Sequence, residues 1–307
     1  MTVKEYSFKS SSGLCEIKAW QWAPEGDVKA VIQMHHGMAE HSGRYKNFIK
    51  AFTDMGYAVF MHDMINHGKS NHDKSLLGYF GDKDGRKHLT ADAKTLIDIA
   101  KGEYPDKKII IAGHSMGSMI MRCFVADYGN DFDGAMFIGT TGPNPLAKAG
   151  GVVTKIIGAF KGNKYKSQAV YEIAFSAYDK PFEHRTRYDW GMRDQKSVDE
   201  YVADEYCGYL FTLAGYDDLM KLVVGCNSDA FYNTLAKDMP VLLTSGDMDP
   251  VGNYGKGIKF VYDKLVHTGH TNVTMQMYPD ARHEILNEIN KEEVYANINA
   301  WIESNIL

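Results

Sequence analysis

One stretch of the chain, residues 109–118, restricts the possible folds more than any other. It begins with three isoleucines, 109–111, a β-branched run that predicts a buried strand. Gly-His-Ser-Met-Gly follows, and apolar residues then recur at helical spacing. A strand that turns at once into a helix needs small residues beside the corner, and Gly113 and Gly117 provide them. In this setting the G-x-S-x-G pattern predicts a nucleophile elbow, with Ser115 raised above the end of a sheet.

Strand and helix patterns alternate along most of the chain. The strands we expect are residues 3–9, 14–22, 30–34, 57–61, 109–111, 134–139, 240–245 and 272–278. Helices are expected at 85–101, at 253–266, after the elbow, and at the C-terminus, where Val294, Ile298, Trp301 and Ile302 share one face. The first two strands read as an antiparallel hairpin. The short β–α connections predict an α/β fold with a mostly parallel sheet and helices on both faces.

The alternation stops near Thr141 and resumes with the strand at 240–245. The residues between, 143–238, are helical in pattern and rich in tyrosine, phenylalanine and tryptophan. An insertion at this point of an α/β fold lies above the ends of the strands. We therefore predict an α/β core made of 1–142 and 239–307, and a helical cap (lid) made of 143–238.

Composition excludes some functions and sets the expected compartment. The chain has 307 residues, 44% of them hydrophobic, and a net charge of −5 with both signs mixed, so nucleic acid is not an expected partner. Its four cysteines are far apart, which favours reduced thiols over a disulfide framework. The N-terminus lacks an apolar signal segment, and no run has the length of a membrane span. We expect a cytoplasmic protein, and the sequence predicts no oligomeric state.

A serine nucleophile needs a base, and the base needs a group that orients it. In this architecture the chain order is serine, acid, histidine. His283 follows the last expected strand and is the predicted base, and Asp249 follows the strand before it and is the predicted orienting acid. Asp247, in the same loop, is the alternative acid, and Asp280 is closer to a turn-capping role.

The tetrahedral intermediate of ester hydrolysis carries an oxyanion, which needs two backbone N–H donors. The amide of Met116 is the first predicted donor, because it follows the nucleophile and begins a helix. The second is expected in the loop after the strand at 30–34. There His36 and Gly37 precede Met38, whose amide we assign as the second donor.

The chain resembles the α/β-hydrolase family of monoacylglycerol lipases and lysophospholipases in three motifs: Gly-His-Ser-Met-Gly at 113–117, His-Gly-Met-Ala-Glu-His-Ser-Gly-Arg-Tyr at 36–45, and Ser-Gly-Asp-Met-Asp-Pro-Val at 245–251. The resemblance covers nearly the whole length and is loosest across 143–238. It implies a serine ester hydrolase with a mobile cap, acting without a cofactor on lipid-like acylglycerol or lysophospholipid esters. It also supports Asp249 over Asp247, because the family's acid follows a Gly-x-x-Asp pattern.

Two other functions on the same fold remain open at this point. A proline-iminopeptidase-like aminopeptidase or amidase would need acidic cap residues aimed at the pocket; the available ones are Glu172, Glu183, Glu200 and Glu205. A non-catalytic ligand-binding member is expected to have lost one of the three catalytic residues. Dehalogenase or epoxide-hydrolase chemistry would need an aspartate where Ser115 stands.

Two further patterns have ordinary interpretations. Six histidines, His35, His36, His41, His62, His67 and His72, are spread over separate loops without the spacing of metal ligands, so we predict hydrogen-bonding roles and no metal. The segment 148–166 is amphipathic and carries five lysines. A cap helix with a solvated lysine face is the first interpretation, and transient contact with a membrane surface is the second.

Overall fold

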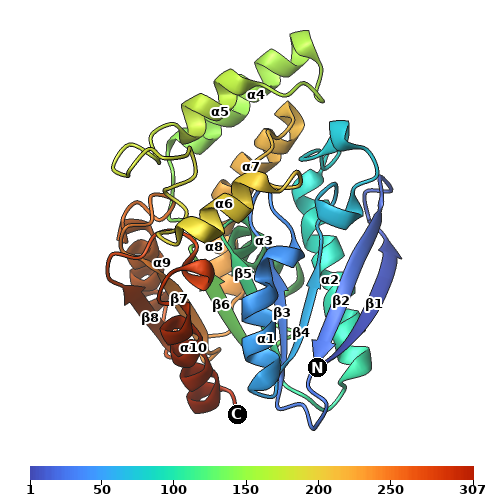
Figure 1. Ribbon diagram of the computed structural model, residues 1–307, viewed down its shortest axis with the longest axis vertical. Helices are drawn as coiled ribbons and strands as arrows, with labels where there is room; N and C mark the ends of the chain where they lie inside the picture. Colours follow the sequence, from blue (N-terminus) through green and yellow to red (C-terminus); the bar gives the residue numbers. More distant parts are fainter.

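An eight-stranded sheet forms the centre of the protein in the computed structural model, which describes residues 1–307 (Figure 1). The strands are β1 (Thr2–Lys9), β2 (Glu16–Ala23), β3 (Val31–His35), β4 (Ala58–His62), β5 (Ile109–His114), β6 (Gly134–Ile138), β7 (Val241–Gly246) and β8 (Val273–Tyr278). Their order across the sheet is β1-β2-β4-β3-β5-β6-β7-β8. β1, β2 and β4 pair antiparallel, and the remaining pairs are parallel. The predicted α/β fold with a mostly parallel sheet is confirmed.

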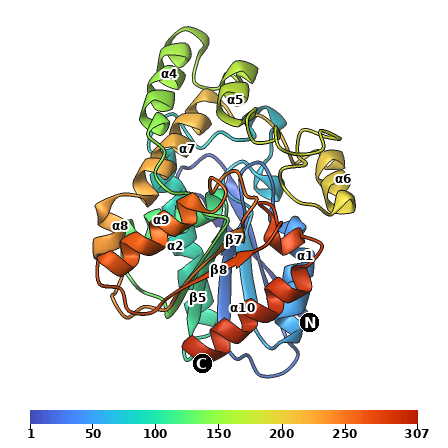
Figure 2. The same cartoon turned by 90° about the vertical axis from the view of Figure 1, so that its left-hand side faces the viewer.

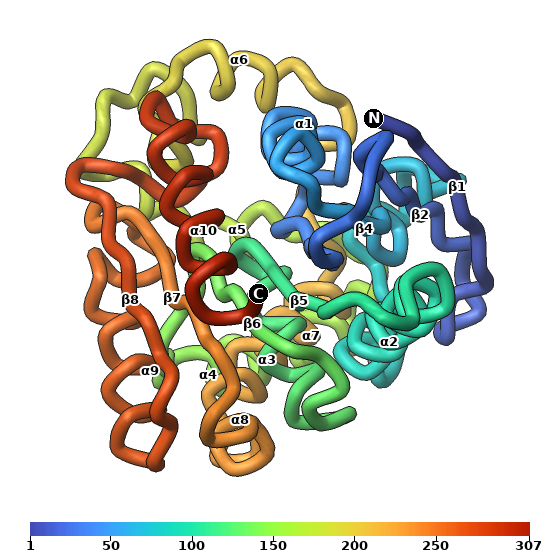
Figure 3. The backbone as a smooth tube through the Cα atoms, turned by 90° about the horizontal axis from the view of Figure 1, so that it is seen from below, coloured from blue at the N-terminus to red at the C-terminus, as the bar shows by residue number.

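The helices lie on both faces of this sheet. They are α1 (Lys46–Asp54), α2 (Gly85–Glu103), α3 (Met116–Tyr128), α4 (Leu146–Lys161), α5 (Gln168–Phe175), α6 (Gln195–Ala203), α7 (Leu213–Cys226), α8 (Asp229–Thr234), α9 (Lys256–His267) and α10 (Lys291–Asn305), with short 3₁₀ turns at 42–45, 68–70, 74–76 and 285–287. Seen from below, α1 and α10 lie on one side of the sheet, and α2, α3, α8 and α9 lie on the other (Figure 3). None of the helices has both the length and the hydrophobicity that crossing a bilayer requires.

Consecutive residues of the central strands serve two separate hydrophobic cores. Ile109 and Ile111 join the core beneath α2, α3 and α9, whereas Ile110 joins the core beneath α1 and α10. Side chains alternate across a strand, so a strand covered on both faces must be apolar at every position. This explains why the isoleucine triplet of β5 is continuous rather than alternating.

The chain between β6 and β7 holds five helices, α4 to α8, and α4, α5 and α7 stand above the core (Figure 2). α7 packs both on α4 and on α3, and α8 also packs on α3. The helical insertion therefore has one part that projects and one part that lies directly on α3, the helix that follows Ser115. The division into a core of 1–142 and 239–307 and a cap of 143–238 stays a prediction.

One predicted helix begins later than the sequence pattern indicates. The apolar spacing predicts a start at 253, but α9 begins at Lys256. Asn253, Tyr254 and Gly255 all have positive φ, at 50°, 54° and 82°. Three successive left-handed residues are incompatible with a right-handed helix. They form a turn that follows the Asp249 loop.

Candidate active site

Ser115 occupies a strained corner between β5 and α3. Its φ and ψ are 53° and −120°, a region that residues other than glycine rarely adopt. A Cβ on Gly113 would lie 2.4 Å from the carbonyl carbon of Gly117, and a Cβ on Gly117 would lie 2.3 Å from the carbonyl oxygen of His35. Both glycines are therefore required by the close approach of α3 to β5 and β3.

His283 and Asp249 meet at the carboxyl end of the sheet. The Nδ1 of His283 lies 2.9 Å from Oδ1 of Asp249, and both side chains are buried. The Asp249 carboxylate also accepts hydrogen bonds from the Val251 amide at 2.8 Å and from the Ser245 hydroxyl at 2.9 Å. An acceptor at Nδ1 places the proton on that nitrogen, which leaves Nε2 free to accept a proton.

The two alternative acids lie elsewhere. Asp247 and Asp280 are both exposed, and neither is hydrogen-bonded to the imidazole. Asp280 has a φ of 57° and belongs to the turn that leads to His283. Of the three aspartates weighed from the sequence, Asp249 is the one that contacts His283.

Ser115 and His283 line the same cavity, but no hydrogen bond joins the Ser115 hydroxyl to the imidazole in this structure. Hydrogen bonds between a nucleophile and its base are often long before substrate binds and shorten in the complex. The Ser115 hydroxyl and the His283 imidazole are both at the wall of this cavity. Trp190 also lines it, with its ring centre 5.3 Å from that of His283.

The two amides assigned to the oxyanion have no competing acceptor. The Met38 amide donates no hydrogen bond within the protein. Met116 is the first residue of α3, so its N–H has no partner inside the helix. The Met64 amide donates to Nε2 of His36 at 3.0 Å, so Nδ1 carries the proton and donates to the Gly37 carbonyl at 2.9 Å. His36 and Gly37 thereby hold the loop that presents Met38.

A cavity of about 900 Å³ opens from these groups toward the helical insertion. Most of its lining residues are hydrophobic, and they come mainly from α4, α5, α7 and the loops between them. The acidic side chains that line it are Glu40 and Glu284. Such a space suits a small molecule with a long apolar part.

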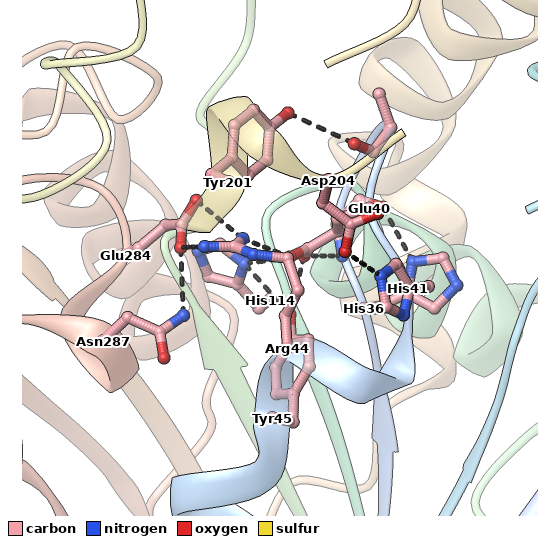
Figure 4. A network of polar contacts seen from close by, with 12 residues as sticks. His36, Glu40, His41, Arg44, Tyr45, His114, Tyr201, Asp204, Glu284 and Asn287 are labelled. Atoms are coloured by element: carbon pink, nitrogen blue, oxygen red, sulfur yellow. Dashed lines mark hydrogen bonds and ion pairs between the residues drawn. The ribbon is translucent and has the colours of Figure 1, made fainter. Parts of the chain in front are cut away.

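A buried polar network beside the cavity was missed by the sequence analysis (Figure 4). Arg44 donates to Glu40 at 2.6 Å and to both carboxylate oxygens of Glu284 at 3.0 and 2.7 Å. Glu40 also accepts from the hydroxyl of Tyr45 at 2.8 Å and lies 3.6 Å from Nδ1 of His114. The spacing of Glu40 and Arg44 was the only local signal, because the partnership with Glu284 spans 240 residues.

Four of the histidines named above form two ring pairs, His35 with His62 at 5.0 Å and His36 with His67 at 5.2 Å between ring centres. His41 lies apart from them, in a small group with other ligand types. Ligand atoms of His41, Asp204 and Cys207 all lie within 4.8 Å of one another. Both ring nitrogens of His41 are already in hydrogen bonds, to Asp204 at 2.9 Å and to the Gly43 amide at 3.1 Å. Burial raises the pKa of the Cys207 thiol, which disfavours the thiolate that binds metals.

Comparison with known proteins identifies the family of the chain. The model of the family described as "Serine aminopeptidase, S33" matches residues 26–290. A monoacylglycerol lipase of Mycolicibacterium smegmatis is 26% identical over 99% of both chains. A monoglyceride lipase of Mus musculus is 25% identical over 93% of this chain and 86% of its own.

Solved structures are also similar. One is the structure of a highly thermostable carboxyl esterase from Bacillus coagulans in complex with glycerol. It superposes on this chain with a TM-score of 0.93 and 30% sequence identity, and the alignment covers 100% of both chains. The chain therefore belongs to the serine aminopeptidase S33 family of α/β-hydrolases, within which it is a monoglyceride-lipase-like carboxylic-ester hydrolase.

Proposed function

We propose that this enzyme hydrolyses acylglycerol- or lysophospholipid-type esters, with Ser115 as nucleophile, His283 as general base and acid, and Asp249 as the residue that orients His283. The observation that carries the proposal is the 2.9 Å hydrogen bond between Asp249 and His283 at the wall of the cavity that Ser115 also lines. The three residues supply the parts of an acyl-transfer site in the expected chain order.

The reaction has two chemical stages. Nε2 of His283 takes the proton of the Ser115 hydroxyl as the oxygen attacks the ester carbonyl, and the same proton is then given to the departing alcohol. Water next attacks the acyl-enzyme while His283 accepts a proton from it. The bond between Ser115 Oγ and the acyl carbon then breaks, His283 returns the proton to Oγ, and the fatty acid leaves. In both stages the amides of Met38 and Met116 would donate to the negatively charged carbonyl oxygen.

Two observations support a lipid-like acyl group. The cavity is large and lined mostly by hydrophobic side chains of the helical insertion. The relatives named above are called monoacylglycerol lipase and monoglyceride lipase. In this proposal, residues 143–238 act as the cap that covers the acyl chain, and 1–142 with 239–307 form the hydrolase core.

The aminopeptidase alternative has less support in the cavity. A free amino terminus would need an unpaired carboxylate near the nucleophile, and the four acidic cap residues weighed from the sequence do not line the cavity. Glu183 pairs with Arg282, Glu200 with Lys46, and Glu205 with Lys74, while Glu172 accepts from Gln168. Glu40 and Glu284, which do line the cavity, share Arg44.

The proposal is tested by comparing wild type with Ser115→Ala on p-nitrophenyl esters, monoacylglycerols and aminoacyl amides. Wild type should cleave the esters far better than the amides, and the variant should lose at least about 10³-fold in kcat. A fluorophosphonate probe should label wild type and not the variant. Ester turnover retained by Ser115→Ala would refute the assignment, and wild type that is neither labelled nor active would favour a ligand-binding protein.

We also propose transient contact with a membrane surface through α4 and α5. Phe160 and Ile173 are 86% and 82% exposed, and Ile156 is 56% exposed. Lys148 and Lys155 lie on the same helix as Phe160. Apolar side chains beside lysines suit a surface of anionic lipid. Wild type should sediment with anionic vesicles at low salt and Phe160→Ser/Ile173→Ser should not; equal sedimentation of the two would refute the contact.

We also propose a cytoplasmic location, which the thiols support. All four cysteines are free, and three of them are buried. Free thiols persist in reducing surroundings, which supports a cytoplasmic location.

A further inference from the structure

We infer that Arg44 is a positioning residue for the reaction, and that Glu40, Arg44 and Glu284 form a buried charged bridge that fixes the oxyanion loop (residues 36–41) relative to the histidine loop (residues 279–284). The inference rests on the proposed function, because it assumes the roles of Met38 and His283. It adds residues that neither motif spacing nor the catalytic scheme requires. Figure 4 shows the bridge, with Arg44 between the two carboxylates.

On one side, the bridge holds the backbone that presents the oxyanion donor. Oε1 of Glu40 accepts a hydrogen bond from the Gly37 amide at 2.5 Å and from the Tyr45 hydroxyl at 2.8 Å. Gly37 directly precedes Met38, so the Glu40 carboxylate fixes the orientation of the peptide next to the proposed donor. A Cβ on Gly37 would lie 2.7 Å from the same carboxylate oxygen and 3.3 Å from the Cβ of Ser115, which shows how closely these groups pack.

On the other side, the bridge holds the residue after the base. Arg44 donates to both carboxylate oxygens of Glu284. Two parallel hydrogen bonds fix the orientation of the Glu284 carboxylate as well as its distance from Arg44. The Asn287 side chain donates to Oε2 of Glu284 at 3.0 Å, and the Glu284 amide donates to the Gly191 carbonyl at 2.7 Å. Glu284, the residue next to His283, is therefore held by contacts to Arg44, to Gly191 and to the adjoining turn at Asn287.

His114 lies between the two sides of the bridge. Its Nε2 lies 3.2 Å from the His283 carbonyl oxygen, and its ring centre lies 4.7 Å from that of His283. Burial opposes protonation of His114, but the Glu40 carboxylate, 3.6 Å from Nδ1, outweighs it and raises the pKa of His114 above its ordinary value. A charged His114 would balance the two carboxylates, which Arg44 alone cannot neutralise.

Burial makes the bridge more than a surface ion pair. The side chains of Arg44, Glu40 and Glu284 are 9%, 4% and 11% exposed. An exposed pair contributes little, whereas removing one partner of a buried pair leaves an uncompensated charge. Without Arg44, Glu40 and Glu284 would repel each other, and the two loops that carry catalytic groups would separate. A displacement of about 1 Å in such a site can cost about 10²-fold in rate.

The test uses steady-state kinetics of Arg44→Met, Glu284→Gln and the double variant on a p-nitrophenyl ester. We expect each single variant to lose about 10- to 100-fold in kcat with KM changed less than about threefold, because chemistry and not substrate binding is disturbed. Since both substitutions break the same bridge, adding Glu284→Gln to Arg44→Met should cost less than about twofold more. In Arg44→Ala, millimolar guanidinium chloride should restore part of kcat, and sodium chloride should not.

Arg86→Met is the matched control, because Arg86 forms a two-pronged pair with Asp127 away from the cavity, at 2.9 and 3.2 Å. Titration with a fluorophosphonate gives the active fraction of each preparation, so misfolding is separated from a slower reaction. Wild-type kcat per labelled site in Arg44→Met, purely additive losses, or no response to guanidinium would overturn the bridge. If instead Ser115→Ala stays active, the proposed function itself fails.

Discussion

At the scale of single residues, the site depends on backbone positions that tolerate only one kind of residue. Ser115 keeps its positive φ because the packing of β5 and α3 on each side constrains its backbone. Gly113 and Gly117 permit the close contact between β5 and α3. The Asp249 carboxylate is held by three hydrogen-bond donors: the Ser245 hydroxyl in β7, the Val251 amide in its own loop, and Nδ1 of His283. Each of these positions makes a specific prediction.

Asp249→Asn should lower kcat by about 10³- to 10⁴-fold with the fold intact. An amide keeps the shape of the carboxylate but does not stabilise the imidazolium, and it permits the wrong tautomer of His283. Asp247→Asn is the control, because that side chain is exposed and should change kcat less than about twofold. Steady-state ester hydrolysis with circular dichroism checks both. A larger loss in Asp247→Asn than in Asp249→Asn would exchange their roles.

Gly117→Ala should destabilise the protein by about 3 kcal/mol or more, because the added Cβ would lie 2.3 Å from the His35 carbonyl oxygen, a backbone atom that has little freedom to move. Gly102→Ala is its counterpart. That glycine is in α2 with nothing within 4 Å of an added Cβ, so alanine should stabilise by about 0.4–1 kcal/mol. Urea unfolding of both variants measures the difference, and equal stabilities would contradict the packing argument.

At the scale of elements, α3 does more than form one side of the Ser115 corner. Arg122, fully buried on α3, donates to the Thr140 hydroxyl at 3.1 Å and the Thr141 carbonyl at 2.9 Å, where the chain leaves β6. It also donates to Asn227 at 3.0 Å and to Tyr232 at 3.3 Å, where the chain returns. One guanidinium therefore binds both ends of the helical insertion.

Arg122→Met should lower the free energy of unfolding by about 2–4 kcal/mol, because several buried acceptors lose their donor. It should also raise KM for long-chain esters more than for short ones, since the insertion covers most of the apolar cavity. Urea unfolding and an acyl-chain series measure these effects. Arg86→Met should cost less than about 1 kcal/mol, because its pair is partly exposed. A variant as stable as wild type would show that Arg122 does not hold the insertion.

At the scale of the whole molecule, acid should unfold the protein through its buried histidines. Burial lowers the pKa of His35 and His67 from 6.5 to about 3. Between these values the unfolded chain binds protons that the folded protein does not, so stability falls as pH drops below about 6.5. Each histidine should contribute about 1.4 kcal/mol per pH unit in that window.

Urea unfolding between pH 7 and 4.5 checks this slope. His67→Gln should reduce it by about 1.4 kcal/mol per pH unit, whatever the variant does to stability at pH 7. His72→Gln should leave the slope unchanged, because His72 is exposed. An unaltered slope in His67→Gln would mean that His67 is protonated in the folded protein.

The large-scale architecture could be predicted because it depends on short-range patterns. A strand covered on both faces is apolar at successive positions, and this pattern identified β5 through its three isoleucines, 109–111. Element ends were less predictable. α9 begins three residues late because Asn253, Tyr254 and Gly255 are left-handed, and the apolar period carries no sign of that turn.

By itself, the sequence determined the sheet, the corner at Ser115 and the order in which serine, acid and histidine occur, because glycine sterics and strand periodicity act between neighbours in the chain. Only the tertiary structure decided that Asp249 and not Asp247 contacts His283, and that Arg44 pairs with Glu284. The tertiary structure also shows that no acidic residue of the insertion lines the cavity. The energy of a buried charge depends on which groups surround it in space, and residues far apart in the chain supply those groups.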